Sequence, residues 1–327
     1  MFDAIYYEEA ARDYPLGKEL LERYGVLEQI PIENHNNIPV MREKENKEFP
    51  RMKRSLIIGV RKTHKYVPNE KVSDFLVPYT SSGCTAMCLY CYLVCNFNKC
   101  AYLRLFVNRE EMFARLQKRA DQTGACFEIG SNSDLVLENT ITGNLDWTLE
   151  RFHGPGALTF PTKFHMVDNL LAIKPQGRVV TRMSVNPQEV IRRVEYGTSP
   201  LAKRIEAVNR LAETGNYELG LLIAPVIFVE GWEALYEELI RTLHDTLSDT
   251  ARRGLFFEVI FMTYSYVHRR INNDAFPNAP ELFDAELMTG RGRGKYAYRQ
   301  EVREKGERVM RGLLKQYFPQ NRVWYVV

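Results

Sequence analysis

The sequence predicts an α/β protein built on a partial (β/α)6 TIM-like barrel, with an N-terminal extension and a C-terminal basic β-hairpin plus helix. Short runs rich in Val, Ile and Phe alternate with helical patterns between residues 75 and 265. The runs are apolar almost throughout, as is typical of strands covered on both faces. This alternation favours βαβ units and a mainly parallel sheet. Beyond about residue 285 the alternation stops and basic residues accumulate.

The strand prediction rests on short β-rich runs. They are residues 55–60, 75–80, 126–130, 157–162, 178–185, 219–228 and 255–262. Helices are expected over 199–215, where Ser199 and Pro200 mark the start, over 233–247, and over 300–317. Residues 31–50 are polar and irregular, and we expect a long surface connection there.

The expected elements divide the chain into three parts of one compact unit. They are an N-terminal extension packed on the barrel (1–74), the barrel (75–270), and a C-terminal hairpin and helix (271–327). Of the 327 residues, 45% are hydrophobic and 26% charged, a mix typical of globular proteins. No apolar run reaches the roughly 18 residues that span a bilayer, and the N-terminus does not resemble a signal peptide. We therefore expect a cytoplasmic monomer with no membrane contact.

The positive charge is concentrated in two segments. Residues 51–65 hold six Lys or Arg and no acidic residue, and residues 289–315 hold nine against three glutamates. Two basic segments on an otherwise acidic chain suit a protein that binds a polyanion, because contacts to phosphates release counterions. Solvated basic faces are the alternative, and the charge pattern alone leaves it open.

Three cysteines form the strongest motif. Cys84, Cys88 and Cys91 directly follow an expected strand in a Cys-x3-Cys-x2-Cys pattern. Three thiolates on one short loop can hold three irons of a [4Fe–4S] cluster and leave the fourth iron open to another ligand. Structural zinc needs four protein ligands, and ferredoxin-type sites use a different four-cysteine run. A zinc or electron-transfer site that recruits Cys95 is the alternative.

This motif, with Tyr90 before its last cysteine and Tyr92 after it, resembles the radical S-adenosylmethionine superfamily. In that superfamily the open iron binds the amino and carboxylate groups of S-adenosylmethionine, whose cleavage supplies radical chemistry that side chains lack. More of the chain resembles the spore photoproduct lyase family. The resembling segments are 14–19, 83–93, 101–104, 107–108, 160–164, 195–199, 224–225, 230–232 and 294–299.

The resemblance implies a DNA-repair lyase. Its substrate is the spore photoproduct, the methylene-bridged thymine dimer 5-thyminyl-5,6-dihydrothymine. The family reverses this lesion directly: a 5′-deoxyadenosyl radical takes a hydrogen from C6, the bridge breaks, and a hydrogen donor quenches the thymine radical. The implied partners are lesion-bearing DNA and an electron donor such as flavodoxin or ferredoxin.

The resemblance also implies a cofactor site at Tyr92, Ser133, Lys163, Ser184 and Ala224. Each position lies at or just after an expected strand, where a barrel gathers its functional loops. A lysine can pair with the carboxylate of S-adenosylmethionine, and serine hydroxyls can bond its ribose and amino groups. From the residues alone, a surface lysine and ordinary serines would fit equally well.

One position departs from the family. Ser131 occupies the place of the family's hydrogen-donating cysteine. A serine O–H bond is too strong to quench an allylic thymine radical, so another group must donate or the substrate must differ. We expect the donor among Tyr92, Cys95 and Cys100, whereas Cys126 is expected near the opposite end of its strand, in core packing.

The C-terminal hairpin departs as well. The resemblance places DNA contacts at Arg291, Arg293, Lys295 and Tyr298, but the family's arginine–tyrosine pair is here Gly290-Arg291. The segment keeps phosphate attraction and loses an aromatic wedge. Two alternatives stay open: a radical enzyme of this family with another nucleic-acid substrate, and a non-enzymatic nucleic-acid-binding protein with a zinc or inert cluster site.

Overall fold

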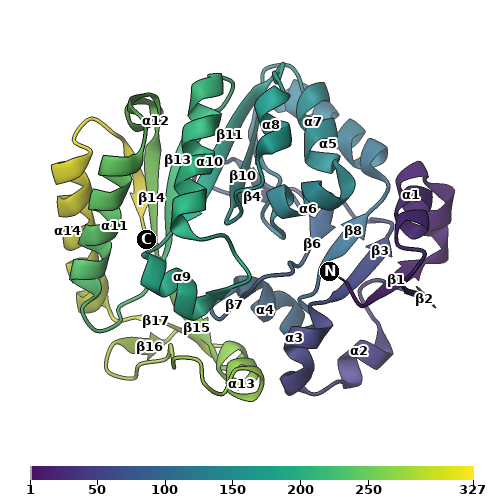
Figure 1. Ribbon diagram of the computed structural model, residues 1–327, viewed down its shortest axis with the longest axis horizontal. Coiled ribbons are helices and arrows are strands. Elements are labelled where there is room, and N and C mark those ends of the chain that lie inside the picture. The colour runs from purple at the N-terminus through teal and green to yellow at the C-terminus, as the bar shows by residue number, and fades with distance from the viewer. Residues whose placement is uncertain (1) are drawn as a thin grey trace.

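The computed structural model describes residues 2–327 and contains a strongly curled sheet with helices on its outer face (Figure 1). Within these residues the large sheet has the order β18-β14-β13-β11-β10-β9-β5-β4, and the neighbours from β5 to β18 run parallel. Its strands are β4 Val67–Pro68, β5 Phe75–Leu76, β9 Cys126–Glu128, β10 Ala157–Thr162, β11 Arg178–Val185, β13 Glu218–Val226, β14 Phe256–Phe261 and β18 Val323–Val326. The expected partial barrel is confirmed.

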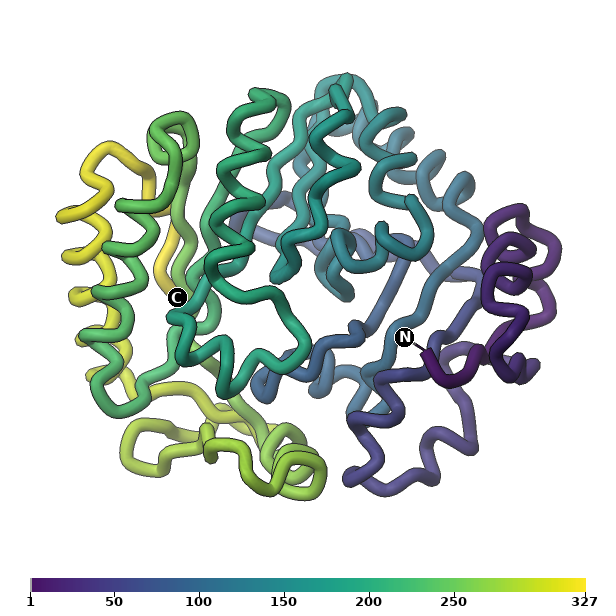
Figure 2. The backbone as a smooth tube through the Cα atoms, in the orientation of Figure 1, coloured from purple at the N-terminus to yellow at the C-terminus, as the bar shows by residue number. Residues whose placement is uncertain are grey.

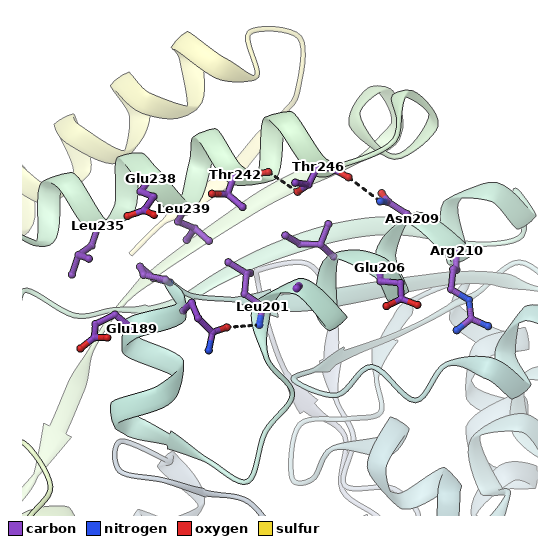
Figure 3. Close-up of a pocket in the computed structure, with 14 residues that line it drawn as sticks. Glu189, Leu201, Glu206, Asn209, Arg210, Leu235, Glu238, Leu239, Thr242 and Thr246 are labelled. Carbon is purple, nitrogen blue, oxygen red and sulfur yellow. Dashed lines mark hydrogen bonds between the residues drawn. The ribbon is translucent and has the colours of Figure 1, made fainter.

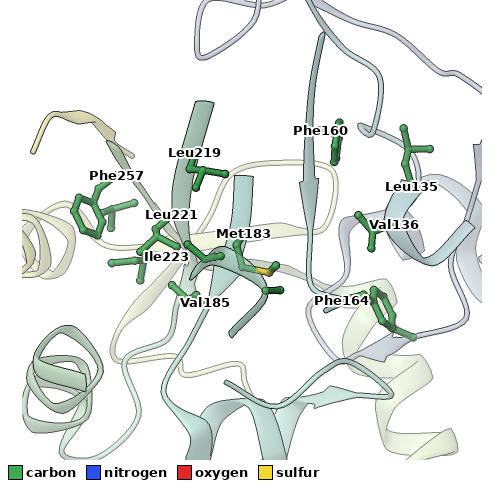
Figure 4. Packing of buried hydrophobic residues seen from close by; sticks show 14 of the residues in the cluster. Leu135, Val136, Phe160, Phe164, Met183, Val185, Leu219, Leu221, Ile223 and Phe257 are labelled. Carbon is green, nitrogen blue, oxygen red and sulfur yellow. The ribbon is translucent and has the colours of Figure 1, made fainter. Parts of the chain in front are cut away.

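Helices follow the barrel strands and cover their outer side. They are α5 Arg109–Thr123, α6 Leu135–Thr142, α7 Asn144–Arg151, α8 Asp168–Ala172, α9 Gln188–Val194, α10 Leu201–Thr214, α11 Trp232–Thr246, α12 Asp249–Gly254 and α14 Gln300–Tyr317. Outward-facing strand residues such as Phe160, Met183 and Leu221 pack in one apolar cluster (Figure 4). Burying this layer drives the sheet and helices together.

The inner face of the barrel is polar at mid-height. The Arg182 guanidinium donates to Glu128 Oε2 at 2.5 Å, to Glu258 Oε2 at 3.2 Å and to Thr159 Oγ1 at 3.0 Å. Arg182 is almost fully buried, so its two carboxylate partners offset the cost of desolvating its charge. This network forms a floor beneath the carboxyl ends of the strands.

A second sheet lies beside the barrel. It belongs to the N-terminal part of the chain, drawn purple to blue in Figure 2, and within residues 2–327 its strand order is β2-β1-β3-β8-β6. Its elements are β1 Ala4–Glu8, β2 Glu28–Ile32, β3 Ser55–Gly59, β6 Ser81–Ser82 and β8 Arg104–Phe106, with α1 Pro15–Arg23, α2 Pro39–Glu43 and α3 Phe49–Met52 nearby in sequence. Since β3 pairs with β8, strands from before and after the cysteine loop share this sheet.

The C-terminal hairpin and the cysteine loop meet at one end of the barrel (Figure 1). The short elements there are β7 Met87–Cys88, α4 Tyr92–Phe97, β12 Glu195–Tyr196, β15 Thr263–Ser265, α13 Tyr266–Ala275, β16 Met288–Gly290 and β17 Lys295–Tyr298. The strands β15, β17 and β16 form a small antiparallel sheet. In the described part of the chain, no helix combines the length and apolarity needed to cross a membrane.

Several expectations are corrected in detail. Residues 31–50 are not a simple surface connection, because they include α2 and the start of α3, with Met41 and Phe49 buried. The strand expected over 75–80 is hydrogen-bonded as β5 only at Phe75–Leu76. The helix expected from Ser199 begins at Leu201, and the Ser199 hydroxyl accepts from His165 N at 3.1 Å.

Candidate active site

Backbone contacts fix the three-cysteine loop just before its first cysteine and again at its second. Gly83 has φ +77°, and a Cβ there would lie 1.9 Å from the Tyr102 carbonyl oxygen, so only glycine fits. Gly83 N donates to Asn132 O at 2.8 Å, in the loop that follows β9. Further along, β7 pairs antiparallel with β12 and sets Cys88 opposite Glu195. The loop is therefore built into the carboxyl end of the barrel.

The cysteines lie in an apolar setting. Cys84 is buried, and Cys88 and Cys91 are partly buried. Burial raises the pKa of the Cys84 thiol to about 12, so holding it as a thiolate requires a nearby cation. Within residues 2–327, no three His, Cys, Asp or Glu side chains are grouped closely enough to hold one metal ion. This grouping is not required for a [4Fe–4S] cluster, because such a cluster binds each thiolate at a different iron.

Lys163 lies at the centre of a polar cradle beside this loop. Its Nζ donates to Ser184 Oγ at 2.7 Å and to Ala224 O at 2.9 Å. Ser184 Oγ in turn donates to Ala224 O at 3.2 Å. Three positions that are far apart in sequence thus meet at the carboxyl ends of β10, β11 and β13, as the barrel prediction requires.

Glu195 completes the cradle. The sequence predicted no role in the site for this residue. Its carboxylate lies 3.1 Å from Lys163 Nζ and 2.6 Å from Arg204 Nη2, and it accepts from Asn186 Nδ2 at 2.9 Å. The Tyr90 hydroxyl also donates to it. Although burial alone would raise the pKa of Glu195, the charges of Lys163 and Arg204 lower it to about 2. The carboxylate therefore stays ionised.

The Ser133 hydroxyl is a buried group without a hydrogen-bond partner in the described part of the chain. It follows β9 and precedes Asp134, whose carboxylate accepts from Lys163 N at 2.8 Å and Thr162 Oγ1 at 2.8 Å. Asp134 thereby ties the Ser133 turn to the Lys163 turn. An unpartnered buried hydroxyl costs free energy unless a ligand bonds to it.

Tyr92 is the first residue of α4, and about half of the residue (52%) is exposed. Burial raises its pKa, as does the negative charge of Cys91 and of Glu128, which belongs to the barrel floor. The negative charges of Cys91 and Glu128 thus both act on the Tyr92 hydroxyl.

The candidate hydrogen donors fall in different places. Cys95 is exposed, and its Sγ lies 3.5 Å from Ser265 Oγ and 3.9 Å from both ring nitrogens of His268. Burial would raise the pKa of Cys95, but the His268 and Ser265 hydrogen bonds outweigh it and lower the pKa. Cys100 packs against the cluster of Tyr6, Ile38, Met41, Met52, Ile57 and Tyr102 under the second sheet.

The remaining two positions lie at opposite ends of β9. Ser131 is partly buried in the turn that follows the strand. Cys126 is the first residue of β9, and its N donates to Asp74 Oδ2 at 2.7 Å. Cys126 therefore lies away from the carboxyl ends of the strands.

His268 joins the cysteine loop to the hairpin sheet. Its Nε2 lies 2.8 Å from Cys91 O and its Nδ1 2.8 Å from Ser265 Oγ. Since a carbonyl only accepts, Nε2 is the donor and Nδ1 accepts from the serine hydroxyl. Ser265 pairs with Lys295 across β15 and β17. The sequence assigned no role to His268, because its partners come from distant segments.

The hairpin residues divide into two groups. Arg291, Arg293 and Lys295 are exposed around the turn between β16 and β17. Tyr298 is only 4% exposed, and its hydroxyl accepts from Phe228 N at 3.0 Å. The expected DNA contact at Tyr298 is therefore not available in this structure, because β17 turns this side chain into the core.

A cavity of about 780 Å³ lies elsewhere, on the outer side between α10 and α11 (Figure 3). Leu201, Ile205, Leu239 and Thr242 are among its lining residues. Its lining includes no cysteine and none of the expected cofactor residues. It is separate from the cradle at the strand ends.

The fold and the site together define a class of protein. Within residues 2–327, the six parallel strands β5, β9, β10, β11, β13 and β14 form a partial barrel, and a three-cysteine loop follows the first of them beside a lysine–serine cradle. This is the arrangement of a radical S-adenosylmethionine enzyme. The chain belongs to the spore photoproduct lyase family, since the family model described as "Spore photoproduct lyase" matches residues 1–327.

Named relatives agree over nearly the whole chain. The spore photoproduct lyase of Bacillus subtilis (strain 168) is 33% identical and covers 98% of this chain and 97% of its own length. That of Geobacillus sp. (strain Y412MC61) has the same identity and coverage. A solved spore photoproduct lyase variant with bound AdoMet and dinucleoside spore photoproduct has a TM-score of 0.92 and 31% identity, covering 100% of this chain and 99% of that one.

Proposed function

We propose that this chain is a DNA-repair lyase that reverses the spore photoproduct to two thymines by radical chemistry. The observation that carries the proposal is the cradle of Lys163, Ser184 and Ala224 beside the Cys84–Cys91 loop. A solved spore photoproduct lyase complexed with dinucleoside spore photoproduct has a TM-score of 0.92 with this chain. Similarity of fold and site over the full chain supports the same substrate.

The proposed cofactors are a [4Fe–4S] cluster and S-adenosylmethionine. Together they supply one-electron cleavage of a carbon–sulfur bond, and hence radical reactivity that side chains lack. Cys84, Cys88 and Cys91 are the proposed cluster ligands, and the orphan hydroxyl of Ser133 suits the amino group of S-adenosylmethionine. Lys163 is the proposed donor for its carboxylate or ribose oxygens, in exchange for one of the three acceptors that its Nζ contacts here.

Tyr92, Ser184 and Ala224 complete the proposed cofactor site. Ser184 and Ala224 hold the ammonium of Lys163 in place through two hydrogen bonds. Tyr92 directly follows Cys91 and is proposed to limit the access of water to the reacting groups. The floor itself is fixed by the pairing of Arg182 with Glu128.

We favour Cys95 as the hydrogen donor that replaces the missing cysteine at Ser131. Cys95 is three residues after Tyr92 on α4, and its thiol is exposed on the side of Ser265, the strand partner of Lys295. Donation breaks the Cys95 S–H bond and forms a thymine methyl C–H bond, and the radical then resides on the Cys95 sulfur. The bound cofactor would have to return a hydrogen atom to this sulfur and take back the radical before the next turnover. The packing of Cys100 and Cys126 argues against both.

The proposed DNA contacts are Arg291, Arg293 and Lys295 on the exposed turn of the hairpin. Their charges attract phosphates, while the buried Tyr298 holds the hairpin on the barrel by packing on Phe228, with ring centroids 4.4 Å apart. We further propose that flavodoxin or ferredoxin supplies the electron and that the protein acts as a cytoplasmic monomer. Light scattering of the purified protein measures its molecular mass and so tests whether it is a monomer.

The function is tested with oxygen-free, iron-reconstituted protein incubated with dithionite, S-adenosylmethionine and dinucleoside spore photoproduct. The proposal predicts thymine formation that is lost in Cys88→Ala. Cleavage of the cofactor without thymine formation would defeat the substrate assignment. About four irons per chain would support the cluster, and one zinc would instead support a non-enzymatic protein.

A second candidate keeps the chemistry and changes the lesion. It is favoured by Ser131 and by Arg291, where the family has a cysteine and a tyrosine. Duplexes that carry other thymine lesions would then stimulate cofactor cleavage more strongly than spore-type DNA. Equal or weaker stimulation by those duplexes argues for the spore photoproduct.

A further inference from the structure

Behind the cysteine loop lies a buried lysine. Lys53 directly follows α3 and is only 3% exposed. Its Nζ donates to Cys84 O at 2.9 Å and to Ala101 O at 2.7 Å. It also lies 5.1 Å from the centre of the Phe49 ring. One of the two hydrogen bonds thus ends on the backbone of a proposed cluster ligand.

No carboxylate forms a salt bridge with Lys53 among residues 2–327. A second buried cation, Arg104, acts on it unfavourably and is itself bonded to the carbonyls of His35 and Cys100. A buried charge without a counter-charge is costly, because carbonyl groups replace only part of its hydration. The two cations therefore need an anion nearby.

The ionisable groups of the loop that Lys53 contacts include its three cysteines. Lys53 Nζ lies 2.9 Å from the carbonyl oxygen of Cys84, and the side chain is buried, so its charge faces this loop without intervening solvent. Three thiolates carry one more negative charge than an oxidised [4Fe–4S] core carries positive charge, so the cluster with its ligands has a net negative charge. Reduction adds a second negative charge. A bound cluster would thus be the missing anion.

We propose that Lys53 is a positioning residue that raises the reduction potential of the cluster. A fixed positive charge stabilises the reduced, more negative cluster more than the oxidised one, and burial strengthens this effect because the local dielectric constant is low. The inference rests on the proposed cluster site. It goes beyond that site because Lys53 touches neither cofactor nor substrate.

A purely structural role for Lys53 makes a different prediction. If the side chain only ties Cys84 to Ala101, its loss loosens the loop without a systematic change in potential. The readout is therefore the midpoint potential of the reconstituted cluster, measured by redox titration followed by electron paramagnetic resonance. Iron and sulfide content is measured in parallel for each variant.

Lys53→Met removes the charge at nearly constant volume, and Arg54→Gln is the matched control. Arg54 is the next residue, is exposed, and pairs with Asp3 on the surface, so its charge is screened by water. We expect a more negative midpoint potential for Lys53→Met and an unchanged potential for Arg54→Gln. An unchanged potential in Lys53→Met with a full cluster would overturn the proposal.

Further variants decide the case in which Lys53→Met binds no cluster. Lys53→Gln keeps a donor without charge, and Lys53→Arg keeps the charge. A cluster in Lys53→Arg but not in Lys53→Gln supports the charge, as does a more negative potential in Lys53→Gln. A normal potential in Lys53→Gln, or loss of the cluster in Lys53→Arg as well, refutes it. If the unsubstituted protein holds no cluster, the proposed function itself fails.

Discussion

Lys163 Nζ lies 3.1 Å from Glu195 Oε1, and this pair joins the two halves of the site. Lys163 belongs to the cofactor cradle, whereas Glu195 pairs in β12 with Cys88 in the cysteine loop. Arg204 holds the other oxygen of the carboxylate at 2.6 Å. A displacement of the cysteine loop would therefore move the lysine that is proposed to bind S-adenosylmethionine.

The stability of the fold should depend on Glu195 in a defined pH range. Its pKa is lowered from 4.5 to about 2, because Lys163 and Arg204 outweigh the effect of burial. A depressed carboxyl pKa gives stability above about pH 4.5 that is lost as the pH falls towards 2. The contribution is about 3 kcal/mol. We expect Glu195→Gln to lower the free energy of unfolding at pH 7 and to flatten its dependence on pH below 4.5.

Denaturant unfolding across this pH range checks the prediction. Glu218→Gln is the control, because Glu218 pairs with Arg178 on the surface, where an ion pair contributes little. Parallel stability curves for the unsubstituted protein and Glu195→Gln would contradict the assigned role of the carboxylate.

Ser133→Ala should weaken cofactor binding without loss of stability. The hydroxyl has no partner in the described chain, so its removal breaks no internal hydrogen bond. A hydrogen bond to a charged ligand group is worth about 1.5–3 kcal/mol, which corresponds to roughly tenfold or more in Kd. Equilibrium dialysis with S-adenosylmethionine measures the change.

Thr181→Val is the matched control for Ser133→Ala. Thr181 also has a buried hydroxyl without a partner, but its position on β11 faces away from Arg182 and Ser184. Its substitution should leave Kd unchanged. Equal losses of affinity in both variants would show that Ser133 has no specific contact with the cofactor.

Cys95→Ala should uncouple lesion opening from repair. Without a thiol donor, the thymine radical persists and reacts with dithionite, so adducts should replace intact thymine. Cys126→Ala should repair normally, since Cys126 lies at the other end of β9. Adding Ser131→Cys to Cys95→Ala should restore thymine. Product analysis by mass spectrometry decides, and intact thymine from Cys95→Ala would rule Cys95 out.

The hairpin arginines should matter more for duplex DNA than for a dinucleoside. We expect Arg291→Ala and Arg293→Ala each to weaken duplex binding and to reduce the salt slope of log K by about 0.9. Repair of the dinucleoside should fall much less, because it offers few phosphates. Arg311→Ala on α14, where Arg311 pairs with Glu307, is the control. An unchanged salt slope in the hairpin variants would contradict the proposed contact.

The sequence predicted the barrel strands best where apolar runs were long. β10 and β11 begin and end at the expected residues, whereas β5 is shorter than its run. The strands β1, β2 and β8 were missed. Each of these three missed strands is short, with five residues in β1, five in β2 and three in β8. Short strands depend on their neighbours in the sheet rather than on local pattern.

Family motifs that fell on strand ends predicted which side chains lie together, and the cofactor role of these side chains stays a prediction. Lys163, Ser184 and Ala224 meet as expected, because parallel strands end at one edge. Glu195 and His268 were missed, since each gains its importance from partners on several distant elements. Single charged or aromatic residues carry no local signal of such contacts.

Repair by the proposed chemistry requires that the lesion give up its C6 hydrogen to a radical derived from S-adenosylmethionine held beside Cys84, Cys88 and Cys91. The most direct measurement uses dinucleoside spore photoproduct deuterated at C6, with mass spectrometry of the cofactor after turnover. We expect deuterium in S-adenosylmethionine or 5′-deoxyadenosine, together with thymine. Thymine formation without transfer of deuterium to the cofactor would contradict it.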